Sequence, residues 1–197
     1  MSLFCEKLKL NYLVCFLQRT MNPVEDLPPD VVKVAQKVVL DLFPTKSREI
    51  YETTYNRFMK WCEEIEVFLN DAPDHKYLMI KVVVIFRVSG ACRSQELVKL
   101  KIEHIEEIKL GLLVQIPHTK TKKPRSFTVM GENCLRTYRK YLPLRSKNFN
   151  ERRFFIKYQD GVCHRQAVGI HKISSISQEV AKDLNLENVN EYRGHCL

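Results

Sequence analysis

Apolar residues recur at helical spacing in several stretches of the chain. Side chains three and four positions apart share one face of an α-helix, so this spacing predicts amphipathic helices. We predict helices over residues 31–43, 50–65, 132–142 and 168–184. The prolines within residues 23–29 interrupt the pattern before the first of these helices, and Pro44 ends it.

One long apolar run, residues 76–89, lies in the middle of the chain. Most of its side chains are hydrophobic, and the period alone does not separate a buried helix from a buried strand. Its length favours a buried helix that ends at Ser89-Gly90, and a further element begins within residues 92–100.

Two short β-type runs, residues 112–117 and 125–129, flank a polar and basic turn at residues 119–124. This arrangement predicts a β-hairpin with a lysine-rich loop. A further apolar run at residues 154–158 is followed by Asp160-Gly161, which predicts a strand and a tight turn. The predicted fold class is therefore α+β, mostly α-helical with a small antiparallel β-sheet.

The composition is that of a folded protein with excess positive charge. The chain has 197 residues, of which 45% are hydrophobic and 28% are charged. This is enough for one core, or one core with a small satellite, and is not the composition of a disordered chain. The net charge of +9 favours a polyanionic partner, nucleic acid or an anionic membrane surface. The apolar segment at residues 10–17 is too short to span a bilayer, and we expect no membrane partner.

Seven cysteines are scattered along the chain, and none forms a CxxC pair. Their spacing is not that of a zinc site, so we expect no metal and no other cofactor. Buried thiols in a reducing compartment are the simplest interpretation. The protein is therefore expected inside the cell, and in the nucleus if its partner is DNA.

Positive charge is concentrated between Thr119 and Lys157. That stretch contains twelve cations and only two acids, Glu132 and Glu151. A solvated helix face normally mixes both signs, whereas a one-sign block interleaved with aromatic residues is typical of a surface that follows DNA phosphates. We predict DNA contacts at Lys122, Lys123, Arg125, Arg139, Lys140, Arg152 and Arg153.

Three motifs occur in an order that is typical of one enzyme family. Residues 90–100 read GACRSQELVKL, in which Arg93 is followed three positions later by Glu96. The hairpin loop carries Lys120, and the chain reads YRGHC at residues 192–196. In this order and spacing the motifs resemble the first arginine box, the hairpin lysine and the start of the HxxR box of tyrosine recombinases of the phage-integrase type.

The amino-acid sequence of these segments is most similar to that of Crypton-type recombinases of animal mobile elements and their domesticated relatives. The resemblance implies a partial tyrosine-recombinase catalytic domain at residues 63–197. It implies a helical remnant of the core-binding domain at residues 31–62, behind a poorly ordered lead-in and linker at residues 1–30. The family's second arginine and tyrosine nucleophile have no counterpart, so we expect a C-terminally truncated and catalytically inactive recombinase.

The resemblance also implies roles for four residues. Arg93 would stabilise the negative charge that grows on the scissile phosphate, and Lys120 would protonate the leaving oxygen, with the other loop lysines as rivals. Glu96 would hold Arg93 in place, or form a surface pair within one helical turn. His195 would contact the phosphate in a complete enzyme, although a disordered terminal histidine fits its position equally well. An intramolecular ion pair for Arg93 and a plain phosphate contact for Lys120 are the alternatives.

The family carries out DNA strand exchange through a phosphotyrosine intermediate. For this chain we expect a DNA-binding protein derived from such a recombinase, with double-stranded DNA and homologous recombinase subunits as partners. The alternative from another class is a non-enzymatic interaction or regulatory module that pairs with full-length relatives. A third interpretation is a gene fragment that does not fold stably, because local propensity does not replace a missing core.

Overall fold

The structure is a computed structural model of the whole chain. The described residues are 53, 60–120, 122–145 and 149–192. The chain divides into two compact units, Met1–Glu66 and Val67–Leu197. The predicted lead-in at residues 1–30 and most of the predicted remnant at residues 31–62 lie outside the described residues. Their assignments remain predictions, and the description below concerns the second unit.

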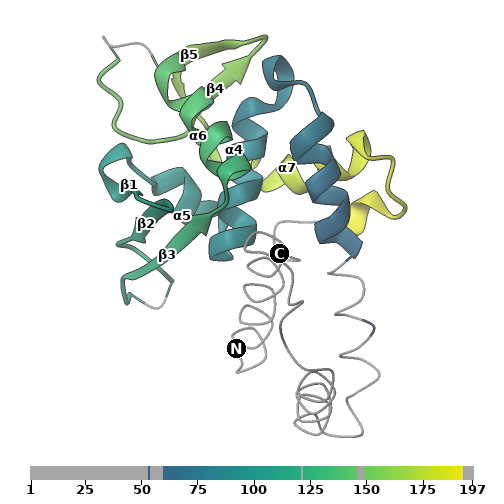
Figure 1. Cartoon of the computed structure of the whole chain (residues 1–197), viewed down its shortest axis with the longest axis horizontal. Helices are drawn as coiled ribbons and strands as arrows, with labels where there is room; N and C mark the ends of the chain where they lie inside the picture. The colour runs from purple at the N-terminus through teal and green to yellow at the C-terminus, as the bar shows by residue number, and fades with distance from the viewer. Residues whose placement is uncertain (1–52, 54–59, 121, 146–148, 193–197) are drawn as a thin grey trace, which may run out of the picture. The chain divides into compact units, whose positions relative to one another are not determined.

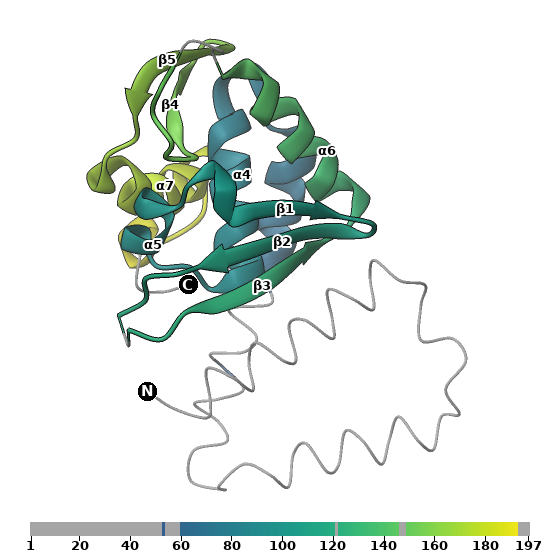
Figure 2. The ribbon, with the colours of Figure 1, turned by 90° about the vertical axis from the view of Figure 1, so that its left-hand side faces the viewer.

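Helix α4 (Asp74–Gly90) lies at the centre of the second unit, with α6, α7 and the β-strands around it (Figures 1 and 2). Every side chain from Tyr77 to Arg87 is buried. A helix that is covered on all sides needs no polar face. This explains why the sequence of α4 is apolar almost throughout. The buried helix predicted over residues 76–89 is confirmed.

The end of α4 brings the backbone close to an aromatic ring. A Cβ atom at Gly90 would lie 2.5 Å from the ring of Phe127, so a larger residue there would displace the ring. Ala91 follows in the left-handed region with φ 44° and turns the chain toward the short helix α5 (Ser94–Lys99).

A three-stranded antiparallel sheet of order β1–β2–β3 packs beside α4 (Figure 2). Its strands are β1 (Ile105–Ile108), β2 (Gly111–Ile116) and β3 (Arg125–Met130). The register pairs Ile116 with Arg125, so residues 117–124 form the loop between β2 and β3. The predicted hairpin with a lysine-rich loop is confirmed, whereas β1 was not predicted.

Strands β4 (Ile156–Gln159) and β5 (Val162–Ala167) form a separate two-stranded antiparallel hairpin. Asp160 and Gly161 make its turn with φ values of 50° and 82°. Two residues with positive φ form the turn that an Asp-Gly pair favours between strands. The strand and tight turn predicted here are confirmed, whereas β5 was not predicted.

The remaining elements complete an α+β fold, as predicted. They are η1 (Ile102–His104), α6 (Glu132–Tyr141), η2 (Leu142–Leu144), α7 (Ile170–Asp183) and η3 (Val189–Glu191). Helices α6 and α7 confirm the helices predicted over residues 132–142 and 168–184. Within the described parts of the chain, no helix has both the length and the apolar character needed to cross a membrane.

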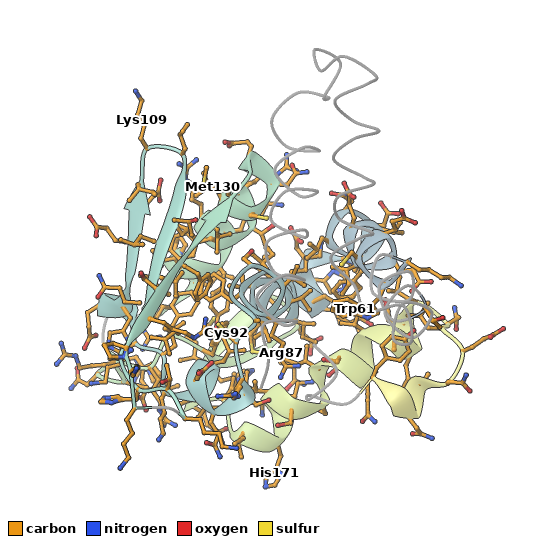
Figure 3. All side chains as sticks on the ribbon, turned by 90° about the horizontal axis from the view of Figure 1, so that it is seen from below. Trp61, Arg87, Cys92, Lys109, Met130 and His171 are labelled. Atoms are coloured by element: carbon orange, nitrogen blue, oxygen red, sulfur yellow. The ribbon has the colours of Figure 1, made fainter. Side chains whose placement is uncertain are left out.

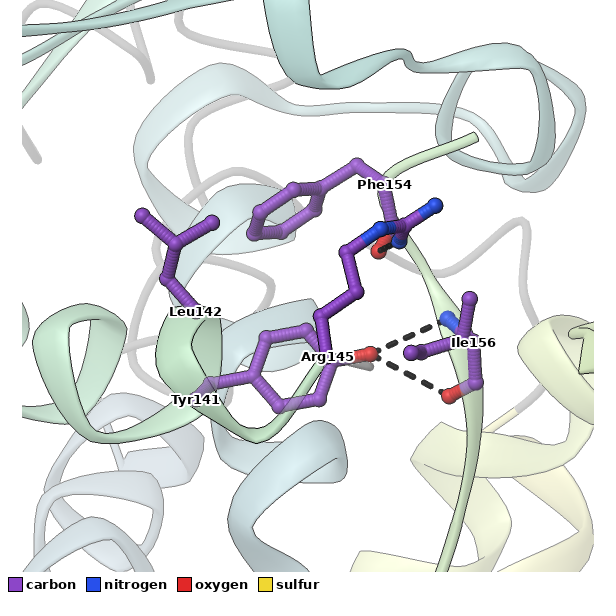
Figure 4. A pocket seen from close by; sticks show the side chains of 5 residues that line it. All are labelled: Tyr141, Leu142, Arg145, Phe154 and Ile156. Carbon is purple, nitrogen blue, oxygen red and sulfur yellow. Dashed lines mark hydrogen bonds between the residues drawn. The ribbon is translucent and has the colours of Figure 1, made fainter. Parts of the chain in front are cut away.

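The side chain of Tyr141 completes the hydrogen bonding of strand β4 (Figure 4). Its hydroxyl accepts a hydrogen bond from the backbone N–H of Ile156 at 3.0 Å and donates one to the carbonyl of the same residue at 3.1 Å. The residue is 3% exposed. Burial raises the pKa of this hydroxyl above its usual range.

In the Tyr141→Phe variant we expect the free energy of unfolding to fall by about 1–3 kcal/mol, the cost of leaving buried polar groups without partners. The ring is kept, but the N–H and carbonyl of Ile156 both lose their partner. Urea unfolding followed by circular dichroism measures the change. Tyr138→Phe is the matched control, because the hydroxyl of Tyr138 has no hydrogen-bond partner among the described residues. An equal loss in both variants would contradict the prediction.

Candidate nucleic-acid interface

Arg93 lies in the turn between α4 and α5, at the N-cap of α5. Its backbone is extended, and its N–H donates to Oε2 of Glu96 at 2.9 Å. A glutamate at the third position of a helix commonly accepts this bond from the N-cap residue. Glu96 therefore fixes the backbone of Arg93, while the Arg93 side chain is half-buried.

A second arginine, Arg125, shares the same carboxylate oxygen. Its Nη2 donates to Oε2 of Glu96 at 2.8 Å, and its Nη1 donates to the carbonyl of Gly90 at 2.6 Å. Nη2 also lies 3.7 Å from the sulfur of Cys92. Burial raises the pKa of the Cys92 thiol to about 12, so the thiol is neutral at physiological pH. Glu96 is thus the anion that balances Arg125, and only 5% of its side chain is exposed.

A third arginine, Arg87, is buried beneath the turn (Figure 3). Its guanidinium donates to Oγ of Ser94 at 2.8 Å, to Oγ of Ser177 at 2.7 Å and to the carbonyl of Ile173 at 2.7 Å. These bonds connect α4 with the first residue of α5 and with α7. Burial lowers the pKa of Arg87 from its ordinary value.

The three arginines surround one turn of the chain. Arg87, on α4, bonds the start of α5 and α7, and Arg125, on β3, bonds the end of α4 and the middle of α5. Arg93 therefore belongs to a turn whose backbone is fixed from two sides. Sequence reasoning identified Arg93 and Glu96 but assigned no role to Arg87. The available signal was a cation inside an otherwise apolar run, which normally indicates a buried and hydrogen-bonded charge.

The lysine-rich loop between β2 and β3 ends beside this turn. Arg125 is the first residue of β3, so the loop ends at the residue that bonds Glu96 and Gly90. Figure 2 shows the loop at the end of the hairpin nearest to α5. The structure thus brings the loop that carries Lys120 toward the turn that carries Arg93.

The described residues of the loop form hydrogen bonds with one another and carry exposed charges. The amide of Lys122 donates to the carbonyl of Thr119 at 3.1 Å, and Oγ1 of Thr119 donates to the carbonyl of Lys123 at 2.7 Å. Lys120, Lys122 and Lys123 are exposed, and none forms an ion pair with a carboxylate of the described residues. These ammonium groups are available to an external anion.

The other cations predicted to contact DNA have acidic partners. The pairs are Arg139–Glu107 at 2.5 Å, Lys140–Asp74 at 2.6 Å, Arg152–Glu103 at 3.2 Å and Arg153–Glu151 at 2.7 Å. Most of these acids come from segments outside the basic stretch. The positive block in the sequence is therefore partly neutralised in the fold, and DNA contacts by its members remain predictions. His195 lies outside the described residues, and within the described part of the chain no cluster of His, Cys, Asp or Glu could hold a metal ion.

No family model matches the chain, and no curated protein matches it. Its structure is similar to the crystal structure of XerA recombinase, with a TM-score of 0.50, 15% sequence identity, and coverage of 100% of this chain and 75% of that one. It is also similar to XerH site-specific recombinase bound to difH substrate in a pre-cleavage complex, with a TM-score of 0.51 and 12% identity. That comparison covers 99% of this chain and 66% of XerH.

The chain has the fold of these recombinases. The α+β class predicted from the sequence is therefore found in proteins that carry out site-specific recombination. At this level of identity the similarity concerns the fold, and the roles of Arg93, Glu96 and Lys120 remain predictions.

Proposed function

We propose that this chain is a DNA-binding protein derived from a tyrosine recombinase, and that the lysine loop and the Arg93 turn bind one stretch of DNA backbone. The observation that carries the proposal is the position of the loop. The loop carries three exposed lysines that have no acidic partner among the described residues, and it ends at Arg125. Arg125 bonds the buried carboxylate of Glu96, which also accepts from the backbone of Arg93. The recombinase fold and the net charge of +9 support the same partner.

Each group would have a distinct role on a backbone phosphate. The planar guanidinium of Arg93 matches two non-bridging oxygens, so it would bind and neutralise the phosphate. Lys120 would approach the bridging oxygen, and Lys122 and Lys123 would contact neighbouring phosphates. These roles concern binding and neutralisation of the phosphate. We propose DNA binding for these residues, and the proposal includes no strand-cleavage step.

The narrower parts of the assignment are also proposals. The segments IPHTKTKKPRSF and RRFFIKYQDG support an origin in Crypton-type elements, and DNA as partner would place the protein in the nucleus. Cys92 and Cys134 form no disulfide, which is compatible with a reducing compartment. Homologous recombinase subunits are the proposed protein partners.

The proposed function is tested by the salt dependence of DNA binding. Each phosphate contact contributes about −0.9 to the slope of log K against log salt on duplex DNA. In the Lys120→Ala, Lys122→Ala, Lys123→Ala triple variant we expect the slope to become less steep by up to about three. Fluorescence anisotropy with a labelled duplex, measured over a range of KCl concentrations, gives the slope.

A matched control removes the same charge elsewhere. Lys109, Lys172 and Lys182 are also exposed, and they lie in the β1–β2 turn and in α7. Their triple alanine variant has the same net charge as the loop variant, and we expect its slope to stay close to that of the wild type. Equal slopes for the wild type and the loop variant would remove the loop from the interface.

A further inference from the structure

Building on the proposed function, we propose that Arg125 is a positioning residue that fixes the lysine loop against the Arg93 turn. The sequence alone placed Arg125 among the DNA-contacting cations. In the structure its guanidinium is instead directed toward Gly90, Glu96 and Cys92. Arg125 thereby connects the root of the loop to both ends of the turn.

The connection is short and consists of a few direct bonds. One oxygen of Glu96 accepts from the backbone N–H of Arg93 at 2.9 Å and from Nη2 of Arg125 at 2.8 Å. Arg125 also pairs with Ile116 across the hairpin, so it closes the loop on the strand side. A displacement of Arg125 therefore moves the loop root and removes a bond from the carboxylate that holds Arg93.

An aromatic ring keeps the guanidinium in place. The Cζ atom of Arg125 lies 5.8 Å from the centroid of the Phe127 ring, which packs edge-on against Phe86 at 6.3 Å. The same ring faces Gly90, where a Cβ would collide with it. The planar fork of arginine reaches two acceptors at once, whereas a lysine ammonium acts as a single point charge. Arg125→Lys should therefore keep the charge but lose the connection.

A double-mutant cycle on DNA binding separates positioning from direct contact. Arg125→Gln is made in the wild type and in the triple alanine variant of Lys120, Lys122 and Lys123. If Arg125 acts through the loop, Arg125→Gln alone reduces the salt slope by clearly more than one. In the loop variant the same change has little further effect, and Arg125→Lys behaves like Arg125→Gln.

Other outcomes would overturn the proposal. A direct phosphate contact reduces the slope by about one in both backgrounds, and Arg125→Lys then retains the slope. A purely structural role lowers thermal stability without changing the slope. A lower helical circular dichroism signal in Arg125→Gln would show that the variant is not fully folded. In that case Arg125→Lys is compared with the wild type instead: a reduced salt slope supports positioning, and an unchanged slope contradicts it.

A measurement without DNA makes the two proposals separable. Hydrogen exchange of residues 111–130 in the free protein should become at least several-fold faster in Arg125→Gln, because the loop root loses its bonds to Glu96 and Gly90. The matched control is Arg139→Gln, which removes an exposed arginine paired with Glu107. Unchanged exchange in Arg125→Gln would refute positioning even if DNA binds. If exchange is faster in Arg125→Gln but the wild-type protein binds no DNA, only the proposed function is refuted.

Discussion

In the Phe154→Ala variant the free energy of unfolding should fall by about 3–5 kcal/mol, the usual cost of removing a buried phenylalanine side chain. Phe154 is 2% exposed and lies at the centre of an aromatic cluster. Its ring stacks on Phe86 at 5.7 Å and on Tyr138 at 6.0 Å, and it meets Phe155 and Tyr141 edge-on at 4.9 and 5.6 Å. The substitution leaves a cavity where α4, α6 and the segment before β4 meet.

Urea unfolding followed by circular dichroism measures this loss. Phe149→Ala serves as the control, because Phe149 is only half-buried and its ring contacts the guanidinium of Arg145 at 5.4 Å. We expect the control to lose much less stability than Phe154→Ala. A loss below about 1 kcal/mol in Phe154→Ala would show that the cluster is not a packed core.

The elements that were predicted correctly are those in which local pattern and tertiary burial agree. Helix α4 has no polar face, and the apolar run at residues 76–89 was long enough to favour a helix over a strand. The Asp160-Gly161 turn was predictable because its conformation depends on two residues only.

Strands β1 and β5 were missed for a common physical reason. The sequence of β1 is IEEI and that of β5 is VCHRQA, and both are edge strands with many exposed polar side chains. Their hydrogen bonds come from β2 and β4, so their structure depends on neighbours rather than on their own hydrophobic pattern. Such strands show little alternation between apolar and polar positions.

The charge pattern was informative about the loop but not about the rest of the basic stretch. The loop lysines stay without acidic partners because the loop protrudes from the sheet. Arg139, Lys140 and Arg152 meet Glu107, Asp74 and Glu103, which lie at least thirty positions away in sequence. Ion pairs between distant segments are set by the fold, so a one-sign stretch of sequence need not form a one-sign surface.

The site shows the same division between local and tertiary information. The bond between Glu96 and the backbone of Arg93 spans three residues, and the box itself indicated that these residues act together. The contact of Arg125 with Glu96 spans twenty-nine positions, and that of Arg87 with Ser177 spans ninety. The local sequence identifies neither partner, so the sequence analysis gave Arg125 a DNA contact and Arg87 no role.

The tertiary contact of Glu96 leads to a second large effect. In the Glu96→Ala variant the free energy of unfolding should fall by about 3 kcal/mol, at the lower end of the cost of breaking a buried ion pair. The carboxylate is buried, so its removal leaves Arg125 without its counter-charge and the N–H of Arg93 without its acceptor. The side chain of Arg125 is 30% exposed, and partial solvation keeps the loss from being larger.

Glu107→Ala provides the matched comparison for Glu96→Ala. Glu107 also pairs with an arginine, Arg139, but the two side chains are 42% and 51% exposed. Exposed pairs contribute little because water already solvates both charges. Thermal and urea unfolding of the two variants should therefore separate clearly, with Glu96→Ala much the less stable. Equal stabilities would mean that Glu96 is solvated like a surface residue, and the connection between the Arg93 turn and the lysine loop would lose its central acceptor.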